Sequence, residues 1–326
     1  MPEILATPGR PQLEPLVLTA SPGSLKSALM RRYDTVLFLL CGLSAILSAG
    51  CGETEPPEMD GGDALRILSL TPNVTEMLFA MGLGDSVVGR STWCRYPPEA
   101  LALPAVGDTL HINLQQVIAL EPTMAFMITG RTGIIRGLEA RGIRAVALRS
   151  DTLPEMFESI RTIGRETGRE EAARRLIERI EADLEAVRRR VAGRPRPRAL
   201  FAFPMTIGSA RIMVAGRGTF VDALLEVAGA ENAFPDRAHW PTVTPQKAIA
   251  MRPEVIIINA TGDSGAPDRI EAIRQAWANW PSIPAVAAGR VHVLTEAYLT
   301  IPGPRVGLAA GRLAEAIHPE VKEGRP

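Results

Sequence analysis

The sequence predicts an α/β protein of two lobes that are joined by one long helix, and three observations support this prediction. From residue 65 onward, short apolar runs alternate with helical patterns, which is typical of α/β proteins with mostly parallel sheets. The segment QQVIALEPTMAFMI at 115–128 returns as QKAIAMRPEVIIIN at 246–259, which indicates an internal repeat. Between the two copies, residues 169–191 carry apolar side chains at helical spacing.

The apolar runs predict six strands, with helices in the gaps between them. The expected strands cover 66–70, 124–129, 145–148, 199–203, 255–259 and 291–294. A second, fainter pair of matching segments, 76–85 and 223–232, occurs in the same order as the first pair. Any two α/β units share some likeness, but two pairs in one order favour two homologous lobes. We place these lobes at residues 65–168 and 194–320.

Residues 169–193 are expected to form the linking helix. The apolar stripe advances in steps of four and three through Ala173, Ile177, Ile180, Leu184, Val187 and Val191. Acidic residues at the start and arginines at the end suit the helix dipole, and Arg194-Pro195 prevents continuation. A stripe of about three heptads could also form a coiled-coil dimer seam. Its place between two α/β lobes favours a rigid spine within one chain, and we expect a monomer.

The N-terminal region has the pattern of an export signal. The apolar run at 36–47 follows Arg31-Arg32 and precedes small residues and Cys51, which predicts a signal peptide over about residues 30–50. A bilayer span needs about 20 apolar residues, so a removed leader is favoured over a retained helix. The leader could begin at Met1 or, as Met30-Arg31-Arg32 suggests, at Met30.

Residues 47–51, LSAGC, resemble a bacterial lipobox, which implies that Cys51 is acylated and anchors the protein. The alternative is an ordinary signal peptide in which Cys51 is incidental. The acidic, Pro/Gly-rich stretch that follows lacks periodicity and suits a flexible tether. The predicted order is therefore a leader region at 1–50, an anchor and tether at 51–64, and then the lobes, in an exported and lipid-anchored protein.

Composition and motifs disfavour several classes of function. Lys and Arg together number 36, as do Asp and Glu, so no net charge would recruit nucleic acid. Only Cys94 of the three cysteines lies beyond the leader and tether, which excludes a disulfide within the body. No P-loop, Ser/His/Asp set or Cys/His metal cluster emerges, and Gly216-Arg217-Gly218 lacks the third glycine of a dinucleotide fingerprint. We expect no enzyme, no catalytic cofactor and no protein-held metal.

Several segments, in order, resemble the vitamin B12-binding receptors of ABC importers. These are RILSLTPNVTEMLFAMG, VVGRSTWCRYPPEA, INLQQVIALEPT, the single long helix, HWPTVTPQKAIAMRPEVI and WPSIPAVAAGRVHVL with PGPR and HPE, over about residues 65–320. The resemblance implies two Rossmann-like lobes on a rigid helix, with cobalamin or a related corrinoid held in a cleft between them. The expected partner is an ABC permease dimer with its ATPase subunits. The alternative ligand is haem or a ferric siderophore, bound by the same superfamily.

A corrin is a broad apolar disc with an amide rim, which calls for aromatic walls and a few hydrogen bonds. Trp93 and Tyr96 lie in a Pro-containing loop, and Trp240 lies in the comparable loop of the second lobe. The resemblance implies that aromatics at the places of Trp93 and Trp240 touch the ligand. The alternative is that these rings pack against their own prolines. Tyr298 is a further, weaker candidate.

Other ligand candidates are a histidine and several arginines. His111 stands in a loop where the resembled family has an aromatic, and a neutral imidazole there could reach an axial position on cobalt or iron. The alternative is a solvated loop histidine. Arginines suit anionic chelates, so a siderophore remains a possible ligand on account of Arg90, Arg95 and Arg131. Of these, Arg131 is a candidate ligand-binding residue.

The resemblance also implies a permease contact through one exposed glutamate in each lobe. The equivalent positions here are Gln115 and Gln246, which occupy matching places in the internal repeat. A charge-assisted contact is about twice as strong as a neutral one. We therefore expect either a less basic permease pocket or a substitute such as Glu76, Glu99 or Glu121.

Overall fold

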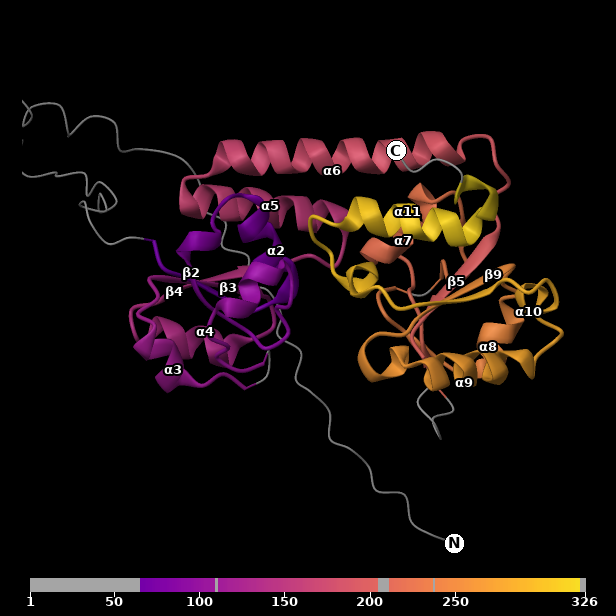
Figure 1. Ribbon diagram of the computed structural model, residues 1–326, viewed down its shortest axis with the longest axis horizontal. Coiled ribbons are helices and arrows are strands. Elements are labelled where there is room, and N and C mark those ends of the chain that lie inside the picture. The colour runs from indigo at the N-terminus through magenta and orange to yellow at the C-terminus, as the bar shows by residue number, and fades with distance from the viewer. Residues whose placement is uncertain (1–64, 109–110, 205–210, 237, 323–326) are drawn as a thin grey trace, which may run out of the picture. The chain divides into compact units, whose positions relative to one another are not determined.

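The computed structural model describes residues 65–108, 111–204, 211–236 and 238–322 (Figure 1). The predicted signal peptide, the tether and Cys51 lie outside the described residues. The described chain forms two four-stranded parallel sheets, a short antiparallel pair of strands, and helices around them. The prediction of an α/β protein with parallel sheets is confirmed.

The first sheet is built from residues before the long helix, with strand order β2-β1-β3-β4. Every neighbouring pair in it is parallel. Its strands are β1 (Ile67–Ser69), β2 (Val87–Arg90), β3 (Met124–Ile128) and β4 (Arg144–Leu148). The accompanying helices are α2 (Pro72–Ala80), α3 (Leu114–Ala119), α4 (Thr132–Glu139) and α5 (Leu153–Thr167). The first four residues of β3 are buried, as expected for an interior strand that is covered on both faces.

The second sheet follows the long helix and has strand order β10-β9-β5-β7, again with parallel neighbours. Its strands are β5 (Arg198–Ala202), β7 (Glu231–Asn232), β9 (Val255–Asn259) and β10 (Val291–Leu294), and β6 (Ile212–Met213) pairs with β8 (Thr242–Val243). The accompanying helices are α7 (Phe220–Val227), α8 (Pro245–Ala250), α9 (Pro267–Ala278), α10 (Pro284–Ala287) and α11 (Val306–Ile317). Short 3-10 turns cover Gly84–Ser86, Pro98–Ala102, Gly262–Gly265, Ala297–Thr300 and Pro319–Lys322.

The internal repeat of the sequence is also a repeat of structure. Its first copy forms α3, a turn and β3, and its second copy forms α8, a turn and β9. Both strands hold interior positions in their sheets. In both turns the residue before the proline has a positive φ, 43° at Glu121 and 49° at Arg252. Because a non-glycine residue rarely adopts this conformation, the shared turn supports a common origin of the two units.

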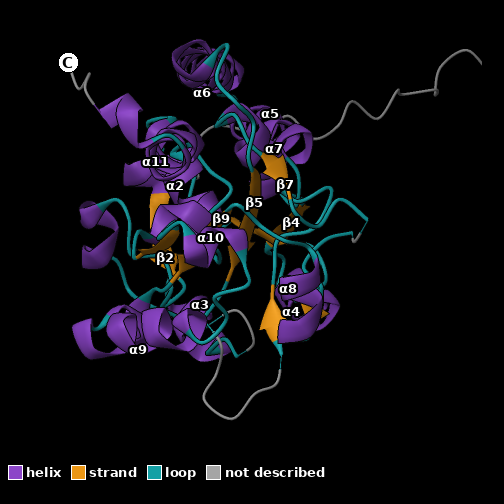
Figure 2. Cartoon of the chain, turned by 90° about the vertical axis from the view of Figure 1, so that its right-hand side faces the viewer, coloured by secondary structure: helices purple, strands orange, loops and turns teal. Residues whose placement is uncertain are grey.

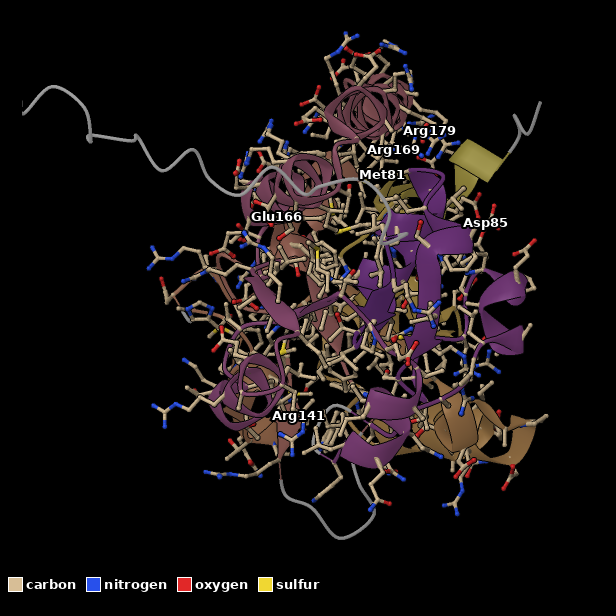
Figure 3. All side chains as sticks on the ribbon, turned by 90° about the vertical axis from the view of Figure 1, so that its left-hand side faces the viewer. Met81, Asp85, Arg141, Glu166, Arg169 and Arg179 are labelled. Carbon is tan, nitrogen blue, oxygen red and sulfur yellow. The ribbon has the colours of Figure 1, made fainter. Side chains whose placement is uncertain are left out.

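The long helix α6 (Glu170–Val191) spans 22 residues. All six residues of the predicted apolar stripe are buried in it, together with Leu176. It packs against α5 at one end and against α7 and α11 toward the other (Figure 1). The stripe is therefore covered within the chain, and the coiled-coil alternative is wrong. Charged side chains, Arg179 among them, surround its outer side (Figure 3).

Helices cover both faces of the sheets (Figure 2). On the α6 side, one apolar core continues from α2 and α5 through α6 to α7 and α11. On the opposite side each sheet has a core of its own, under α3 and α4 in the first and under α8, α9 and α10 in the second. The two halves are thus joined along one layer, and a close approach there requires Gly307, because a Cβ on it would lie 2.5 Å from the Asp183 Cβ.

All six predicted strands are present, with ends shifted by at most one residue where they differ. The prediction missed β2 and the two-residue strands β6, β7 and β8. These segments are short, and β2 contains Gly89, so they lack the apolar run that marks a strand.

Candidate ligand-binding site

Residues that follow the carboxyl ends of strands from both sheets line a pocket of about 390 Å³, which we call the interlobe pocket. The first sheet contributes Ile128, Ser150 and Asp151, from the ends of β3 and β4. The second half contributes Phe203, Met213, Phe220, Trp240, Thr300 and Pro302. Ligands of open α/β sheets bind at this edge of the sheet, so its position suits a binding site.

One wall of the interlobe pocket is aromatic. The ring centroid of half-buried Trp240 lies 5.5 Å from that of Phe203 and 6.3 Å from that of Phe220. Beside this wall, the Phe220 backbone N–H donates to the Asp151 carbonyl oxygen at 2.7 Å, which ties the two halves together. Trp240 therefore packs on aromatic neighbours instead of on its own proline alone, and the wall suits a flat apolar ligand.

The polar groups of the interlobe pocket are few. The Ser150 hydroxyl accepts a hydrogen bond from Asn73 Nδ2 at 2.8 Å, and the Thr300 hydroxyl donates to the Ala297 carbonyl oxygen at 3.3 Å. Asp151 is exposed, and its carboxylate has no hydrogen-bond or ion-pair partner among the described residues. One free acceptor thus stands beside the aromatic wall.

Trp93 and Tyr96 lie in the loop after β2, on either side of buried Cys94. The thiol of Cys94 lies 3.3 Å from the Ser91 hydroxyl and donates toward the Ser69 carbonyl oxygen at 3.8 Å. Burial raises the pKa of this thiol, so Cys94 is a structural residue. With Cys94 inward, Trp93 is left 56% exposed and Tyr96 44% exposed.

Tyr96 contributes to a second region in which the two halves meet, the ion-pair cluster of Glu76, Tyr96, Tyr298 and Arg305. The guanidinium of Arg305 donates to Glu76 from Nε at 2.9 Å and from Nη2 at 2.6 Å. The same guanidinium carbon lies 3.9 Å from the ring centroid of Tyr96 and 5.3 Å from that of Tyr298. This arrangement combines a bidentate ion pair with cation–π contacts.

Glu76 is 3% exposed, so the suggestion that it replaces an exposed docking glutamate is wrong. Burial raises the pKa of the Glu76 carboxyl, and the hydrogen bonds and charge of Arg305 oppose that rise. Glu99 and Glu121, the other two suggested substitutes, are exposed.

Tyr298 does not line the interlobe pocket. It lines a different pocket of about 390 Å³ between α6 and α11, with Val187, Gly307 and Arg312 among its neighbours. Burial raises the pKa of its phenol. The structure therefore brings Tyr298 together with Tyr96, around Arg305, and not with Trp240.

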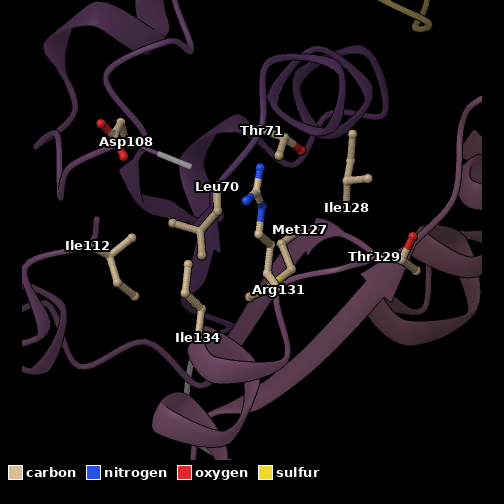
Figure 4. Close-up of a pocket in the computed structure, with 9 residues that line it drawn as sticks. All are labelled: Leu70, Thr71, Asp108, Ile112, Met127, Ile128, Thr129, Arg131 and Ile134. Atoms are coloured by element: carbon tan, nitrogen blue, oxygen red, sulfur yellow. The ribbon is translucent and has the colours of Figure 1, made fainter. Parts of the chain in front are cut away.

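Arg131 lines a smaller pocket of about 130 Å³, which we call the Arg131 pocket (Figure 4). Its remaining lining residues are Leu70, Thr71, Asp108, Ile112, Met127, Ile128, Thr129 and Ile134. Ile128 belongs to both this pocket and the interlobe pocket, so the two pockets adjoin. Arg90, in contrast, donates to the carbonyl oxygens of Ala100 and Ser91, which gives it a structural role.

His111 lies outside the linings of both pockets, and its side chain is 87% exposed. Its backbone N–H donates to Asp108 at 2.6 Å, and its Nδ1 lies 3.7 Å from the same carboxylate oxygen. Over the described residues, no group of three or more His, Cys, Asp or Glu side chains could hold a metal ion.

Gln115 and Gln246 are both exposed, each in the first turn of a short helix. The side chain of Asn113 caps α3, and that of Thr244 caps α8. The repeat thus presents the two amides at equivalent places.

Sequence reasoning named Trp240, which lines the interlobe pocket, but did not name its neighbours there. Phe203 follows β5, and Ser150 and Asp151 follow β4, so the rule that ligands bind at the carboxyl ends of strands could have found them. Phe220 begins α7, and its contact with Trp240 depends on tertiary packing that no local pattern marks.

The fold and the pocket between its two halves define a two-lobed binding protein. The model of the family described as "Periplasmic binding protein" matches residues 67–298, and this chain belongs to that family. It is therefore a transport substrate-binding protein of an ABC importer, and not an enzyme.

Relatives and solved structures agree with this assignment. The chain is 26% identical to an uncharacterized ABC transporter substrate-binding lipoprotein, YvrC, of Bacillus subtilis, over 85% of this chain and 95% of the relative. It is 26% identical to the vitamin B12-binding protein of Pectobacterium carotovorum, over 86% and 96% of the two chains. The periplasmic heme-binding protein RhuT of Roseiflexus, in its apo form, superposes with a TM-score of 0.68 at 27% identity, over 80% of this chain and 100% of that one.

These similarities indicate an exported, extracytoplasmic protein. Of the helices in the described residues, none has both the length and the apolar character that a membrane span requires.

Proposed function

We propose that this chain captures cobalamin or a related corrinoid outside the cytoplasmic membrane and delivers it to an ABC permease. The observation that carries the proposal is the aromatic wall of Trp240, Phe203 and Phe220, beside which the Asp151 carboxylate has no partner among the described residues. A flat apolar macrocycle would pack on the rings, and amide N–H groups at its rim would donate to the carboxylate. Trp93, which is exposed on the first lobe, is the candidate for a second contact.

Relatives support a corrinoid over other substrates. The protein of Pectobacterium carotovorum that matches 86% of this chain is named a vitamin B12-binding protein. Asp151 points the same way, because a carboxylate in the pocket favours neutral amide donors over acidic groups at that place.

Haem is the second candidate ligand. RhuT, which is more similar to this chain in sequence than the solved vitamin B12-binding protein of Vibrio cholerae, is a heme-binding protein. On this alternative His111 or a tyrosine would be the axial ligand of the haem iron. The exposed side chain of His111 is free to turn toward a bound haem. Ferric siderophores are the third option, for which Arg95 and Arg131 are the available cations.

Titration of the purified body with cyanocobalamin, haem and a ferric siderophore tests these alternatives. Each ligand absorbs visible light, and binding near Trp240 would quench tryptophan fluorescence. We expect a saturable absorbance shift with cyanocobalamin at a stoichiometry of one. If cyanocobalamin gives no response, the protein is not a cobalamin receptor. If haem alone then binds saturably, haem is the ligand.

We also propose that residues 1–50 direct export and that Cys51 is acylated, with residues 51–64 as the tether to the lobes. The lipoprotein name of the Bacillus subtilis relative supports this. In a bacterial host, the full chain should incorporate labelled fatty acid and fractionate with membranes, and Cys51→Ala should abolish both. If both the wild type and Cys51→Ala are recovered as soluble proteins without fatty acid, Cys51 is not a lipid anchor.

Docking to the permease is proposed through the faces that carry Gln115 and Gln246. Their exposure and equivalent helical positions support a symmetric contact with two permease subunits. Photocrosslinkers at 115 and 246 should capture a permease in membranes, whereas one at exposed Arg136 should not. If the probe at Arg136 captures the permease and the probes at 115 and 246 do not, docking through these faces is refuted.

A further inference from the structure

The Arg131 pocket contains hydrogen-bond donors that the protein itself leaves unused. Thr71 is 6% exposed, and its Oγ1 atom has no hydrogen-bond partner within the described chain. The guanidinium of Arg131 makes no hydrogen bond or ion pair with any residue that the structure describes. A buried hydroxyl without a partner is unfavourable, so a hydrogen-bonding group of a ligand that reached it would be stabilised there.

The backbone around Thr71 adds a third favourable feature. Thr71 is the N-cap residue of α2, and its side chain does not cap the helix. The first residue of α2 is Pro72, which has no backbone N–H, but the helix dipole still makes this end of α2 partially positive. Figure 4 shows the Arg131 side chain extending toward Thr71, with Asp108 and Ile112 across the pocket.

The shape of the pocket limits the size of the group. About 130 Å³ holds several water molecules or a short side arm, but not a macrocycle. Leu70, Met127 and Ile134 supply apolar walls that suit a methylene chain. Because Ile128 lines both pockets, an arm of a ligand in the interlobe pocket could enter the Arg131 pocket.

We propose that the Arg131 pocket is a subsite for a carboxylate-ended side arm of the ligand. The planar guanidinium matches the two oxygens of a carboxylate, and the Thr71 hydroxyl supplies a further donor. The positive end of the α2 dipole also favours an anion here. Asp108 also lines the pocket, but one oxygen of its carboxylate accepts the His111 backbone N–H. This proposal rests on the proposed function, because it assumes a macrocycle in the interlobe pocket.

A carboxylate subsite predicts that a macrocycle with an acidic side arm binds more tightly than its fully amidated or esterified counterpart, which the interlobe pocket also accepts. The test uses two pairs of probes: a monocarboxylic acid of cyanocobalamin against cyanocobalamin, and haem against its dimethyl ester. The variants are Arg131→Gln, Thr71→Val and, as control, Arg136→Gln, each compared with the wild type. The control removes the same charge from an exposed position on α4, the helix that begins directly after Arg131.

We expect the wild type to bind the acid of at least one pair more tightly than its neutral counterpart. Arg131→Gln should weaken binding of that acid by about ten- to a hundredfold, as for loss of a hydrogen-bonded charge, and leave the neutral probe nearly unchanged. Thr71→Val should weaken it by several-fold, and Arg136→Gln should have no effect. The pair that responds distinguishes a corrinoid acid from haem.

Two results would overturn the subsite while leaving the proposed function intact. One is a wild type that binds both members of each pair equally well. The other is an Arg131→Gln variant that weakens the acid and the neutral probe by the same factor. Binding of none of the four probes would instead remove the proposed function, and the subsite with it.

Discussion

Side chains from both lobes meet in two regions, the ion-pair cluster and the interlobe pocket. The charged groups of the cluster are paired with each other, whereas the carboxylate of the interlobe pocket is not paired within the described chain. In the cluster, the buried carboxylate of Glu76 receives two hydrogen bonds from Arg305, on which two tyrosine rings lie. In the interlobe pocket, Trp240 is half-buried and the Asp151 carboxylate has no partner in the described chain. The first region is complete in itself, and the second leaves surface for a ligand.

The difference teaches that residue type alone does not separate a contact that joins the lobes from one that binds a ligand. Trp93 and Tyr96 stand in one loop, yet Tyr96 covers Arg305 while Trp93 is exposed without a ring partner among the described residues. Tyr298, which lies in the second lobe as Trp240 does, also belongs to the cluster. Four experiments test this division.

The largest effect is expected from Arg305→Met, which leaves the Glu76 carboxylate buried without its cation. Removal of one partner of a buried ion pair costs about 3 kcal/mol or more, so the free energy of unfolding at neutral pH should fall by about that amount. Urea denaturation monitored by circular dichroism measures it. The double variant Glu76→Gln/Arg305→Met should recover much of the loss, because no charge is then left buried.

Arg312→Met is the matched control for this change. Arg312 lies on α11, the helix that begins directly after Arg305, and donates to Glu296 at 2.6 Å, but both side chains are over a quarter exposed. Its loss should cost about 1 kcal/mol or less. Equal losses for Arg305→Met and Arg312→Met would show that the cluster does not join the lobes more strongly than a surface pair.

The next largest effect is expected from Trp240→Ala on ligand affinity. Loss of a central aromatic contact costs about 2 kcal/mol or more, which corresponds to about thirtyfold weaker binding of cyanocobalamin. Trp280→Ala is the control, since Trp280 is also half-buried and packs on Trp277 at 5.5 Å, outside the interlobe pocket. Both variants should lose stability, but only Trp240→Ala should lose affinity in an equilibrium titration.

A smaller effect divides the two aromatics of one loop. Trp93→Ala should change the free energy of unfolding by less than about 0.5 kcal/mol, since the ring is 56% exposed, and should weaken cyanocobalamin binding several-fold. Tyr96→Ala should lower stability by about 1 kcal/mol through the lost cation–π contact. If Tyr96→Ala weakens binding while stability is unchanged, Tyr96 belongs to the binding region and the division fails at this residue.

Much of the fold follows from patterns that are local in the sequence. The stripe of α6 and the apolar run of β9 were predicted because each needs only the period of one element. Gly89 shows the limit: a Cβ there would lie 2.7 Å from a Leu120 methyl carbon, so packing demands the glycine that concealed strand β2.

The site was less predictable than the fold, because its contacts join distant parts of the chain. Glu76 and Arg305 are 229 positions apart, and no local pattern pairs them. Trp240 and Arg131 were named by residue type and by the loops that carry them. Phe203, which packs on Trp240, and Thr71, which lines the same pocket as Arg131, became visible only when strand ends were brought together.

The smallest expected effect is a pH dependence that belongs to the cluster alone. Burial raises the pKa of Glu76 above its usual value near 4.5, so the folded protein holds this proton to higher pH than the unfolded chain does. The resulting contribution to stability is fully present below pH 4.5 and is lost as the pH rises through the pKa of the folded state. Glu76→Gln lacks this titration. The unfolding free energy of the wild type should therefore fall relative to that of the variant as the pH rises from 4.5 through the pKa of folded Glu76, and the difference should be constant above that pKa. A difference that moves in the opposite direction would show that Arg305 outweighs burial, which would make the cluster a source of stability at neutral pH and not only a device that fixes how the lobes meet.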